Sequence, residues 1–284
     1  MKSKILTQSA FRPVGGGGSK LELNCNWGFN LKSLLTLKKC AFTLAEVLIT
    51  LGIIGVVAAM TLPTLIQNYQ NQVHVNQLKK FVSTLEQGFQ KMLADEGVER
   101  LSDLSNLKDG YDNSTEANAK DAINDFFSRG FQVSYYKATN YTLNGEDAGI
   151  SDFILFNDGS AIILLGVMAK DPQRLSSADC ELAKSKGGSM CSLSLHFIFD
   201  TNGIKGPNKW GRDLFFFYVS DEGKLYPHGG KDVALMIDPS QSYESSPYYW
   251  KNASNSDGGC DFSDTDAPLG CAARIIENGW VMDY

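Results

Sequence analysis

Residues 38–66 read KKCAFTLAEVLITLGIIGVVAAMTLPTLI, and from Phe42 to Ile66 the only ionisable side chain is that of Glu46. A helix of about 20 apolar residues crosses the hydrocarbon core of a bilayer, so this run is long enough to span a membrane. A charged group inside hydrocarbon costs on the order of 2.5 kcal/mol or more and needs a partner. The run predicts a transmembrane helix with a functional acid near its start. The alternative is a snorkelling or protonated Glu46 in an ordinary anchor.

These residues resemble the processing signal of type IV pilins and type II secretion pseudopilins. In that family a basic leader ends in a small residue, usually glycine, and an N-methylated Phe is the first residue of the mature chain. A Glu is fifth, and a Pro is commonly the twenty-second. The corresponding positions here are Lys38 and Lys39, Ala41, Phe42, Glu46 and Pro63. Ala41 is the one departure, because the family usually has glycine at the cleavage point.

The resemblance implies that a prepilin peptidase cleaves between Ala41 and Phe42 and that Phe42 is then methylated. It implies that the new amine pairs with Glu46 of a neighbouring copy. The implied fold class is α+β and pilin-like: a long N-terminal transmembrane helix packed on an antiparallel β-sheet head with disulfide-closed loops. Other pilin-like subunits and an inner-membrane assembly platform are the remaining partners, and no cofactor is required.

Four regions are expected along the chain. They are a cleaved basic leader (1–41), a transmembrane and filament-core helix (42–66), an amphipathic continuation of that helix (67–95) and an extracytoplasmic globular head (96–284). The leader is long and contains four consecutive glycines from Gly15. It is expected to be disordered or to include residues upstream of the true start.

Small residues within the apolar run, Gly52, Gly55, Ala58 and Ala59, would let neighbouring helices approach closely. The alternative is that they are apolar filler. Pro63 lacks a backbone donor and clashes with the preceding turn, so it predicts a kink or a local opening of the helix. Beyond it, apolar residues recur at three- and four-residue steps, which predicts a helical face packed on a head. These are Leu78, Phe81, Val82, Leu85, Phe89, Met92 and Leu93.

Charge differs on the two sides of the apolar run. Residues 1–41 contain seven Lys or Arg and one acidic residue, whereas residues 42–284 contain nineteen basic and thirty-one acidic residues, a net charge of −12. Because positive charge stays on the cytoplasmic side, we expect a single-pass protein of the inner membrane with its N-terminus inside and its head periplasmic or extracellular. An acidic head argues against direct nucleic-acid binding by the isolated subunit.

Four cysteines follow the membrane segment, and they fall into two pairs with the same spacing: Cys180, Cys191, Cys260 and Cys271. An even number in an oxidising compartment predicts disulfides. Three connectivities are open, and the spacing favours Cys180–Cys191 and Cys260–Cys271. A zinc site is disfavoured because the Cys-x-x-Cys spacing is missing.

The head is expected to be rich in strands. Residues 151–166 predict a hairpin around Asn157-Asp158-Gly159, residues 193–199 and 214–219 predict two more strands, and the chain turns again before Leu225. Four antiparallel strands on one long helix is the expected arrangement. A short helix is predicted over 272–278, stopped by Gly279 and docked to the head by Trp280 and Tyr284.

Two interpretations compete for the loop between residues 200 and 213. Oxygen ligands for calcium could come from Asp200, Asn202, Asn208 and Asp213. The calcium pattern lacks its closing Glu, and Lys205 and Arg212 add positive charge. The favoured interpretation is therefore a loop held by side-chain-to-backbone turns, and calcium binding is the alternative.

Enzymatic motifs are missing around the three histidines, His74, His196 and His228, which lie in unrelated sequence contexts. His196 alternates within a predicted strand and is interpreted as structural. The predicted function is a structural subunit of a type IV pilus-like or type II secretion pseudopilus filament. The alternatives are a competence pseudopilin for DNA uptake and a membrane-anchored extracytoplasmic protein with an unrecognised enzymatic site. The N-terminal signal does not distinguish these machines, nor a major from a minor subunit.

Overall fold

The computed structural model describes residues 43–105, 127–137, 142–143, 146–147, 152–167, 173–203, 205–263 and 266–284. The chain divides into two compact units, Met1–Thr61 and Leu62–Tyr284. Lys38, Lys39, Ala41 and Phe42 lie outside the described residues. The expected α+β class is confirmed, with a long N-terminal helix, an antiparallel sheet and two disulfides.

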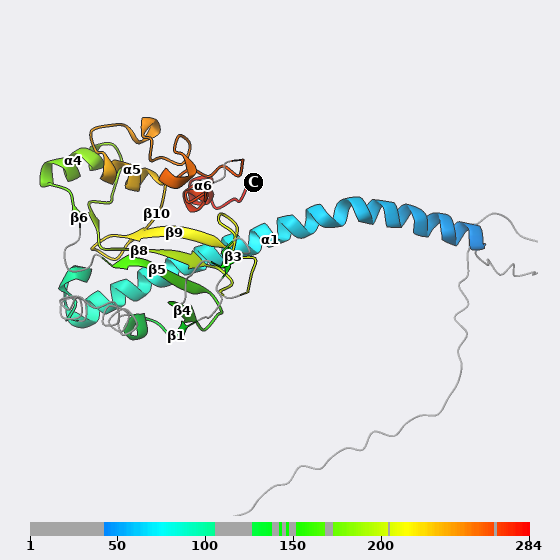
Figure 1. Cartoon of the computed structure of the whole chain (residues 1–284), viewed down its shortest axis with the longest axis horizontal. Helices are drawn as coiled ribbons and strands as arrows, with labels where there is room; N and C mark the ends of the chain where they lie inside the picture. Colours follow the sequence, from blue (N-terminus) through cyan, green and yellow to red (C-terminus); the bar gives the residue numbers. More distant parts are fainter. Residues whose placement is uncertain are drawn as a thin grey trace, which may run out of the picture. The chain divides into compact units, whose positions relative to one another are not determined.

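The long helix α1 runs from Leu44 to Glu96 (Figure 1). Pro63 lies inside it, and the helical assignment continues through this position. The helix is therefore not opened at Pro63, and the other expected effect, a kink, stays a prediction. By length and composition α1 could cross a membrane, because an 18-residue window within it has a mean hydropathy of 2.2. None of the side chains of that window is buried.

The part of α1 that belongs to the second unit packs on the head through one apolar stripe. Its buried residues recur at three- and four-residue steps, as an amphipathic helix requires. All of the expected positions are buried except Val82, which is only partly buried, and Val75 and Gly88 are buried in addition. The buried residues are Val75, Leu78, Phe81, Leu85, Gly88, Phe89, Met92 and Leu93.

The main sheet contains six antiparallel strands in the order β1-β4-β5-β8-β9-β10, rather than the four expected (Figure 1). The bounds are β1 Val133–Lys137, β4 Asp152–Phe156, β5 Ala161–Val167, β8 Leu195–Asp200, β9 Leu214–Val219 and β10 Leu225–Pro227. Two small two-stranded ladders accompany it, β2 Thr142–Leu143 with β3 Glu146–Asp147, and β6 Gln173–Arg174 with β7 Ser192–Leu193. The predicted hairpin is β4–β5, turned at Gly159 with φ 88°.

Cores lie on both faces of the sheet, which explains why its central strands β8 and β9 are mostly apolar on both of their sides. On β8, Phe197 and Phe199 face α1, whereas Ile198 faces the opposite core. Phe81 of α1 stacks on Phe199 with 3.4 Å between ring centroids. The opposite core also contains Trp210, so the sheet is covered by α1 on one face and by later segments on the other.

Three shorter helices also belong to the head: α4 Ser177–Ser185, α5 Lys231–Ile237 and α6 Cys271–Glu277. Residues 127–130 are helical as well. Single 3-10 turns lie at η1 Leu101–Asp103, η2 Tyr243–Ser245 and η3 Asn255–Asp257. The helix predicted over 272–278 is α6, shifted by one residue. It is followed by Gly279 with φ 74°, and Trp280 and Tyr284 pack against the core as expected.

The disulfides are Cys180–Cys191 and Cys260–Cys271, the local pairing that the spacing favoured. Each closes a loop between residues 11 apart. Cys191 lies just before β7 and Cys271 begins α6, so each bridge ties a loop to a regular element of the head.

Candidate functional site

The N-terminal end of α1 forms a capping box between Thr43 and Glu46. The amide of Thr43 donates to Glu46 Oε2 at 2.8 Å and the Thr43 hydroxyl donates to the same oxygen at 3.0 Å. In return, the amide of Glu46 donates to Thr43 Oγ1 at 3.2 Å. A Ser or Thr before the first helical residue and a Glu three positions later satisfy orphan amides of the first turn in this way. Thr43 was missed by the sequence analysis, although the Thr-x-x-Glu spacing is its signal.

The capping box leaves one oxygen of the carboxylate open. Oε2 takes both bonds from Thr43, and Oε1 accepts none from the residues that the structure describes. An ionised carboxylate has about four lone-pair sites, so Glu46 can serve its own helix and still accept a further donor. The site can therefore receive a cation without losing its cap.

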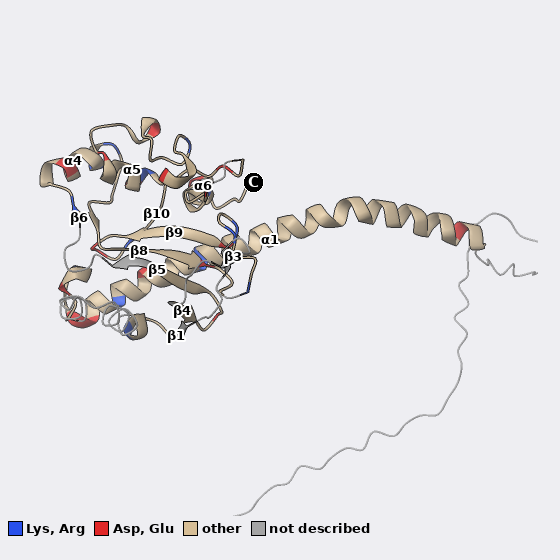
Figure 2. Ribbon diagram, viewed as in Figure 1, with Lys and Arg blue, Asp and Glu red and all other residues tan. Residues whose placement is uncertain are grey.

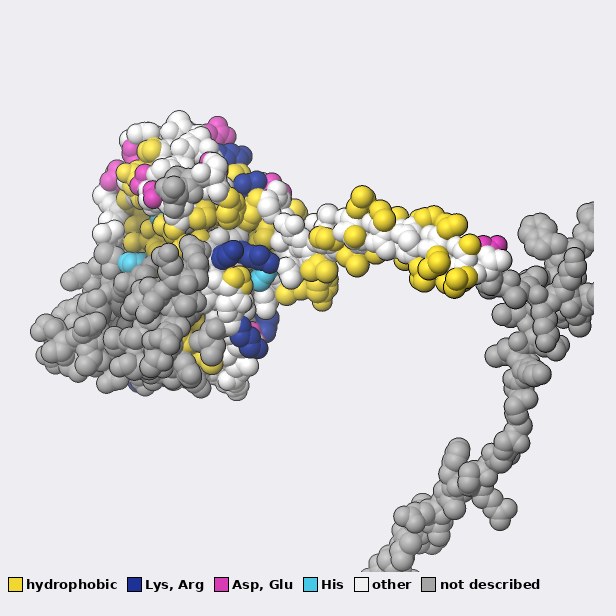
Figure 3. Space-filling model, turned by 45° about the vertical axis from the view of Figure 1, so that its right-hand side comes forward, with side chains coloured by type: hydrophobic (Ala, Val, Ile, Leu, Met, Phe, Trp, Pro, Cys, Tyr) yellow, Lys and Arg dark blue, Asp and Glu magenta, His cyan; other side chains and the backbone are white. Residues whose placement is uncertain are grey.

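The apolar segment of α1 has almost no charge, and its side chains are not covered by other residues that the structure describes. Glu46 is the only charged residue between Phe42 and Ile66. Figure 2 draws most of the ribbon of this segment in the tan of uncharged residues, and Figure 3 shows apolar side chains along its visible face. Leu44 is 79% exposed, Ile54 63% and Met60 74%. Side chains of this kind require lipid or another apolar surface around them.

Gly52 and Gly55 are not required by the packing of their own chain. A Cβ added at either position would meet nothing within 4 Å. Glycine inside a helix costs roughly 1 kcal/mol relative to alanine, and no described contact of this chain offsets that cost. Close approach of a second helix would explain why glycine occupies these two positions. The alternative is that both residues are neutral apolar filler.

The loop between β8 and β9 contains the four residues predicted to supply oxygen ligands to calcium. Asp200 and Asp213 are both buried, and Asp200 Oδ1 accepts from the amides of Asn202 at 3.0 Å and Gly203 at 2.8 Å. Asp213 accepts from the amide of Asn208 at 3.0 Å and from that of Lys209. Both carboxylates thus hold the loop backbone in side-chain-to-backbone turns.

These bonds favour the interpretation of the loop as structural. A calcium ion takes six to eight oxygen ligands, whereas Asp200 and Asp213 already bind backbone amides. In the described ranges no three His, Cys, Asp or Glu side chains are grouped so that they could hold a metal. Calcium binding by this loop stays a prediction.

Two of the three histidines meet on the sheet face opposite α1, despite their unrelated sequence contexts. His228 Nδ1 lies 3.0 Å from the hydroxyl of Tyr218, and His196 lies across the β8–β9 ladder from Tyr218. The ring centroid of Phe216 is 4.8 Å from that of His228 and 5.8 Å from that of His196. Burial lowers the pKa of His228 to about 4 and raises the pKa of Tyr218 to about 12. Both groups are therefore uncharged at neutral pH.

Comparison with family models gives two matches that adjoin each other. Residues 36–62 match the prokaryotic N-terminal methylation motif, a type IV pilin-like prepilin signal, and residues 64–284 match a family of unknown function, DUF6613. Comparison with characterised proteins and with solved structures gives no match. The boundary between the two matches falls at Pro63, next to the division between the two compact units. The chain thus belongs to the DUF6613 family and carries a type IV pilin-like N-terminal methylation signal ahead of its DUF6613 region.

Proposed function

We propose that this chain is a structural subunit of a type IV pilus-like or type II secretion pseudopilus filament. A prepilin peptidase cleaves it between Ala41 and Phe42, Phe42 is methylated, and the subunit assembles through the N-terminal part of α1. The observation that carries the proposal is the exposed apolar segment of α1 up to Ile66, whose only carboxylate, Glu46, keeps an open oxygen at the helix start. Type IV pilin-like subunits are generally structural, and that is the role proposed here.

Assembly follows from the chemistry of the cleaved end. Cleavage before Phe42 creates a cationic amine next to an apolar helix, and this amine needs an anion when the helix leaves the lipid headgroups. Glu46 of a neighbouring copy supplies that anion through Oε1. A buried ion pair adds little net stability over its desolvation cost, but the loss of one partner costs roughly 3–5 kcal/mol. The pair therefore fixes the register of adjacent subunits rather than their gross affinity.

Topology follows from charge and disulfides. The basic leader stays in the cytoplasm, α1 crosses the inner membrane once, and the acidic head with its two disulfides lies in an oxidising compartment. The inner-membrane assembly platform and other pilin-like subunits are the proposed partners, in addition to further copies of this chain.

Two variants of Glu46 separate its charge from its capping role. Glu46→Ala loses both, whereas Glu46→Gln keeps a side chain that completes a capping box but carries no charge. We expect both variants to insert and to be cleaved, and both to be depleted more than about tenfold from sheared filaments, because each leaves the amine without its anion. Immunoblots of membrane and filament fractions measure this. Normal incorporation of Glu46→Gln would show that the carboxylate acts only as a helix cap.

A further inference from the structure

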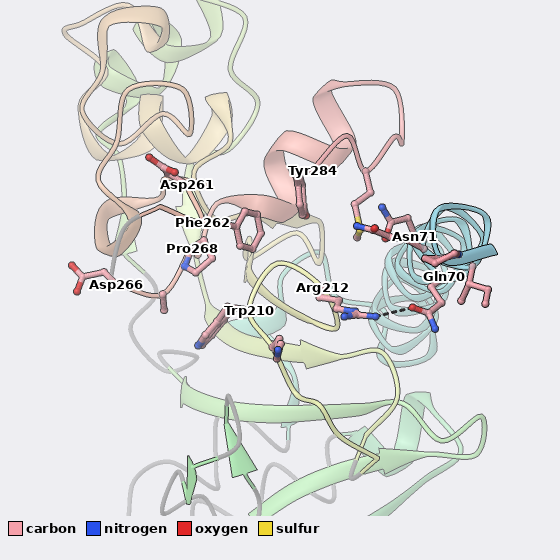
Figure 4. A pocket seen from close by; sticks show the side chains of 15 residues that line it. Gln70, Asn71, Trp210, Arg212, Asp261, Phe262, Asp266, Pro268 and Tyr284 are labelled. Atoms are coloured by element: carbon pink, nitrogen blue, oxygen red, sulfur yellow. Dashed lines mark hydrogen bonds between the residues drawn. The ribbon is translucent and has the colours of Figure 1, made fainter. Parts of the chain in front are cut away.

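A groove of about 830 Å³ opens within the second unit beside the first turns of its part of α1. Its walls are residues 63–71 of α1, the loop at 209–212, residues 261–262 and 266–268, and the last residues of the chain. Figure 4 shows Phe262, Trp210 and Tyr284 on the loop and C-terminal side, and Arg212 reaching across to Gln70 of α1. Four segments that are distant in sequence thus build one surface.

Two large apolar side chains on the walls of this groove are exposed. Ile66 and Phe262 line it and are 53% and 52% exposed. They come from α1 and from a loop about two hundred residues later, and both open onto the same groove. Exposed apolar side chains that share a concave surface favour an interaction site over scattered surface residues.

Arg212 and Asp261, two of the four charged side chains that line the groove, already have hydrogen-bond partners, so the occupant need not be ionic. The Arg212 guanidinium donates to Gln70 Oε1 at 2.7 Å. Asp261 Oδ1 accepts from the amide of Ser263 at 2.9 Å and from its hydroxyl at 2.7 Å. Lys209 and Arg212 are balanced by Asp261 and Asp266 along the lining. An uncharged partner can therefore cover the apolar rim without isolating a net charge.

The chain itself supplies a segment of matching chemistry. From Val47 to Met60 every residue is uncharged, and no residue of this stretch is buried. Once a subunit leaves the lipid, this surface needs apolar cover, and each copy offers one such segment and one groove. A contact between two different surfaces of identical copies is heterologous, and when it does not close into a ring it generates an open helical assembly.

We propose that the groove receives the apolar segment 47–60 of a second copy, which packs against Phe262 and Ile66. This inference rests on the proposed filament function and adds to it a specific surface of the DUF6613 region. It explains why the apolar rim lies on a head that otherwise exposes few large apolar side chains. Each subunit contributes its segment to one neighbour and its groove to another.

Cysteine pairing between two differently tagged copies tests the contact. Cys180, Cys191, Cys260 and Cys271 are already in disulfides, and Cys25→Ser with Cys40→Ser removes the remaining thiols. One copy carries Phe262→Cys, and the other carries a single cysteine at successive positions from 47 to 60. In oxidised filaments we expect mixed dimers at positions that recur every three or four residues, as one helical face requires. The matched control is Leu182→Cys, which is 40% exposed away from the groove and should give no dimer.

The outcomes separate this inference from the proposed function. If filaments form but Phe262→Cys pairs with no position from 47 to 60, or if Leu182→Cys pairs as readily, the docking is wrong and the filament function stands. Dimers between two Phe262→Cys copies would overturn the proposed docking and indicate a groove-to-groove contact instead. If the native chain never enters a filament fraction, the proposed function is wrong and the docking with it.

Discussion

Glu46 serves two purposes at the scale of a single residue. Within its own chain it caps α1 through Thr43, and through Oε1 it stays available to a donor from outside. The cap places the carboxylate at the first turn, where the helix dipole also favours negative charge. The residue that sequence reasoning singles out as costly in a membrane is thus already held in place before a partner arrives.

Replacement of Thr43 by Val tests the cap without touching the carboxylate. Thr43→Val keeps the shape of the side chain but removes the hydroxyl that accepts from the Glu46 amide. We expect the first turn of α1 to lose about 1 kcal/mol. Hydrogen exchange of the first-turn amides in detergent micelles measures this. Thr50→Val is the matched control, because Thr50 bonds only the carbonyl of Val47 inside the helix. Equal exchange in both variants would argue against the cap.

His228 predicts a pH dependence of the head. Burial lowers the pKa of His228 from 6.5 to about 4, with a small opposing effect of Asp257 and a small further lowering by His196. Between pH 6.5 and pH 4 the unfolded chain binds a proton at this histidine that the folded chain does not bind. The free energy of unfolding therefore has its full value above pH 6.5 and decreases as the pH falls. The loss is on the order of 3 kcal/mol.

Denaturant unfolding of the full chain in detergent at pH 7 and pH 4.5 checks this, with His228→Gln as the comparison. The variant should lose less stability between the two pH values than the native chain does. An unchanged difference would assign the pH dependence to other groups, among them His74 and His196, whose pKa values burial also lowers.

At the scale of elements, one buried carboxylate ties η1, which follows α1 in the chain, to the sheet. Asp221, in the β9–β10 turn, accepts from the amide and hydroxyl of Ser102 in η1, at 2.9 and 3.1 Å, and from the Ser194 hydroxyl at 3.0 Å. Arg174 of β6 is its ionic partner. These hydrogen bonds and this ion pair hold the pKa of Asp221 below its usual range, against the effect of burial.

Asp221→Asn should therefore be costly. The variant leaves Arg174 without its anion and places an amide group among the hydroxyl and amide donors that the carboxylate accepts from. Because the Arg174 side chain is 43% exposed and water screens its charge, we expect a loss of about 1–3 kcal/mol. Asp158→Asn is the matched control, because Asp158 pairs with Lys80 at 2.9 Å on the exposed surface, where such pairs contribute about 0–1 kcal/mol. Urea midpoints of the two variants provide the comparison, and similar midpoints would refute the role of Asp221.

Elements with a strong local signal could be predicted from the sequence, and those set by distant contacts could not. Apolar runs identify β4, β5, β8 and β9, and the stop at Gly279 identifies α6. The strand β1, with the sequence VSYYK, lacks such a run and gains its place by pairing with β4. The helices α4 and α5 are short and depend on tertiary support, which no window of sequence reveals.

At the scale of the whole molecule, the residues that indicate a membrane segment are contiguous in the sequence, whereas the residues that line the groove come from distant segments. The apolar run, its acid and its basic leader are contiguous, so the filament interpretation follows from residues 38–66 alone. The groove joins α1, two loops and the C-terminus, and its existence depends on how strands more than a hundred residues away fold back on α1. Sequence reasoning could identify Trp280 and Tyr284 as core residues, but not the surface that Tyr284 helps to build.

The mass of the mature chain's N-terminal peptide tests the central claim most directly. Protein recovered from its native membranes or filaments should begin with an N-methylated Phe42 and retain the whole of α1, with no trace of residues 1–41. A chain that keeps its first 41 residues, or one cut after the apolar segment so that α1 loses residues 44–61, would contradict assembly through a newly exposed amine and Glu46.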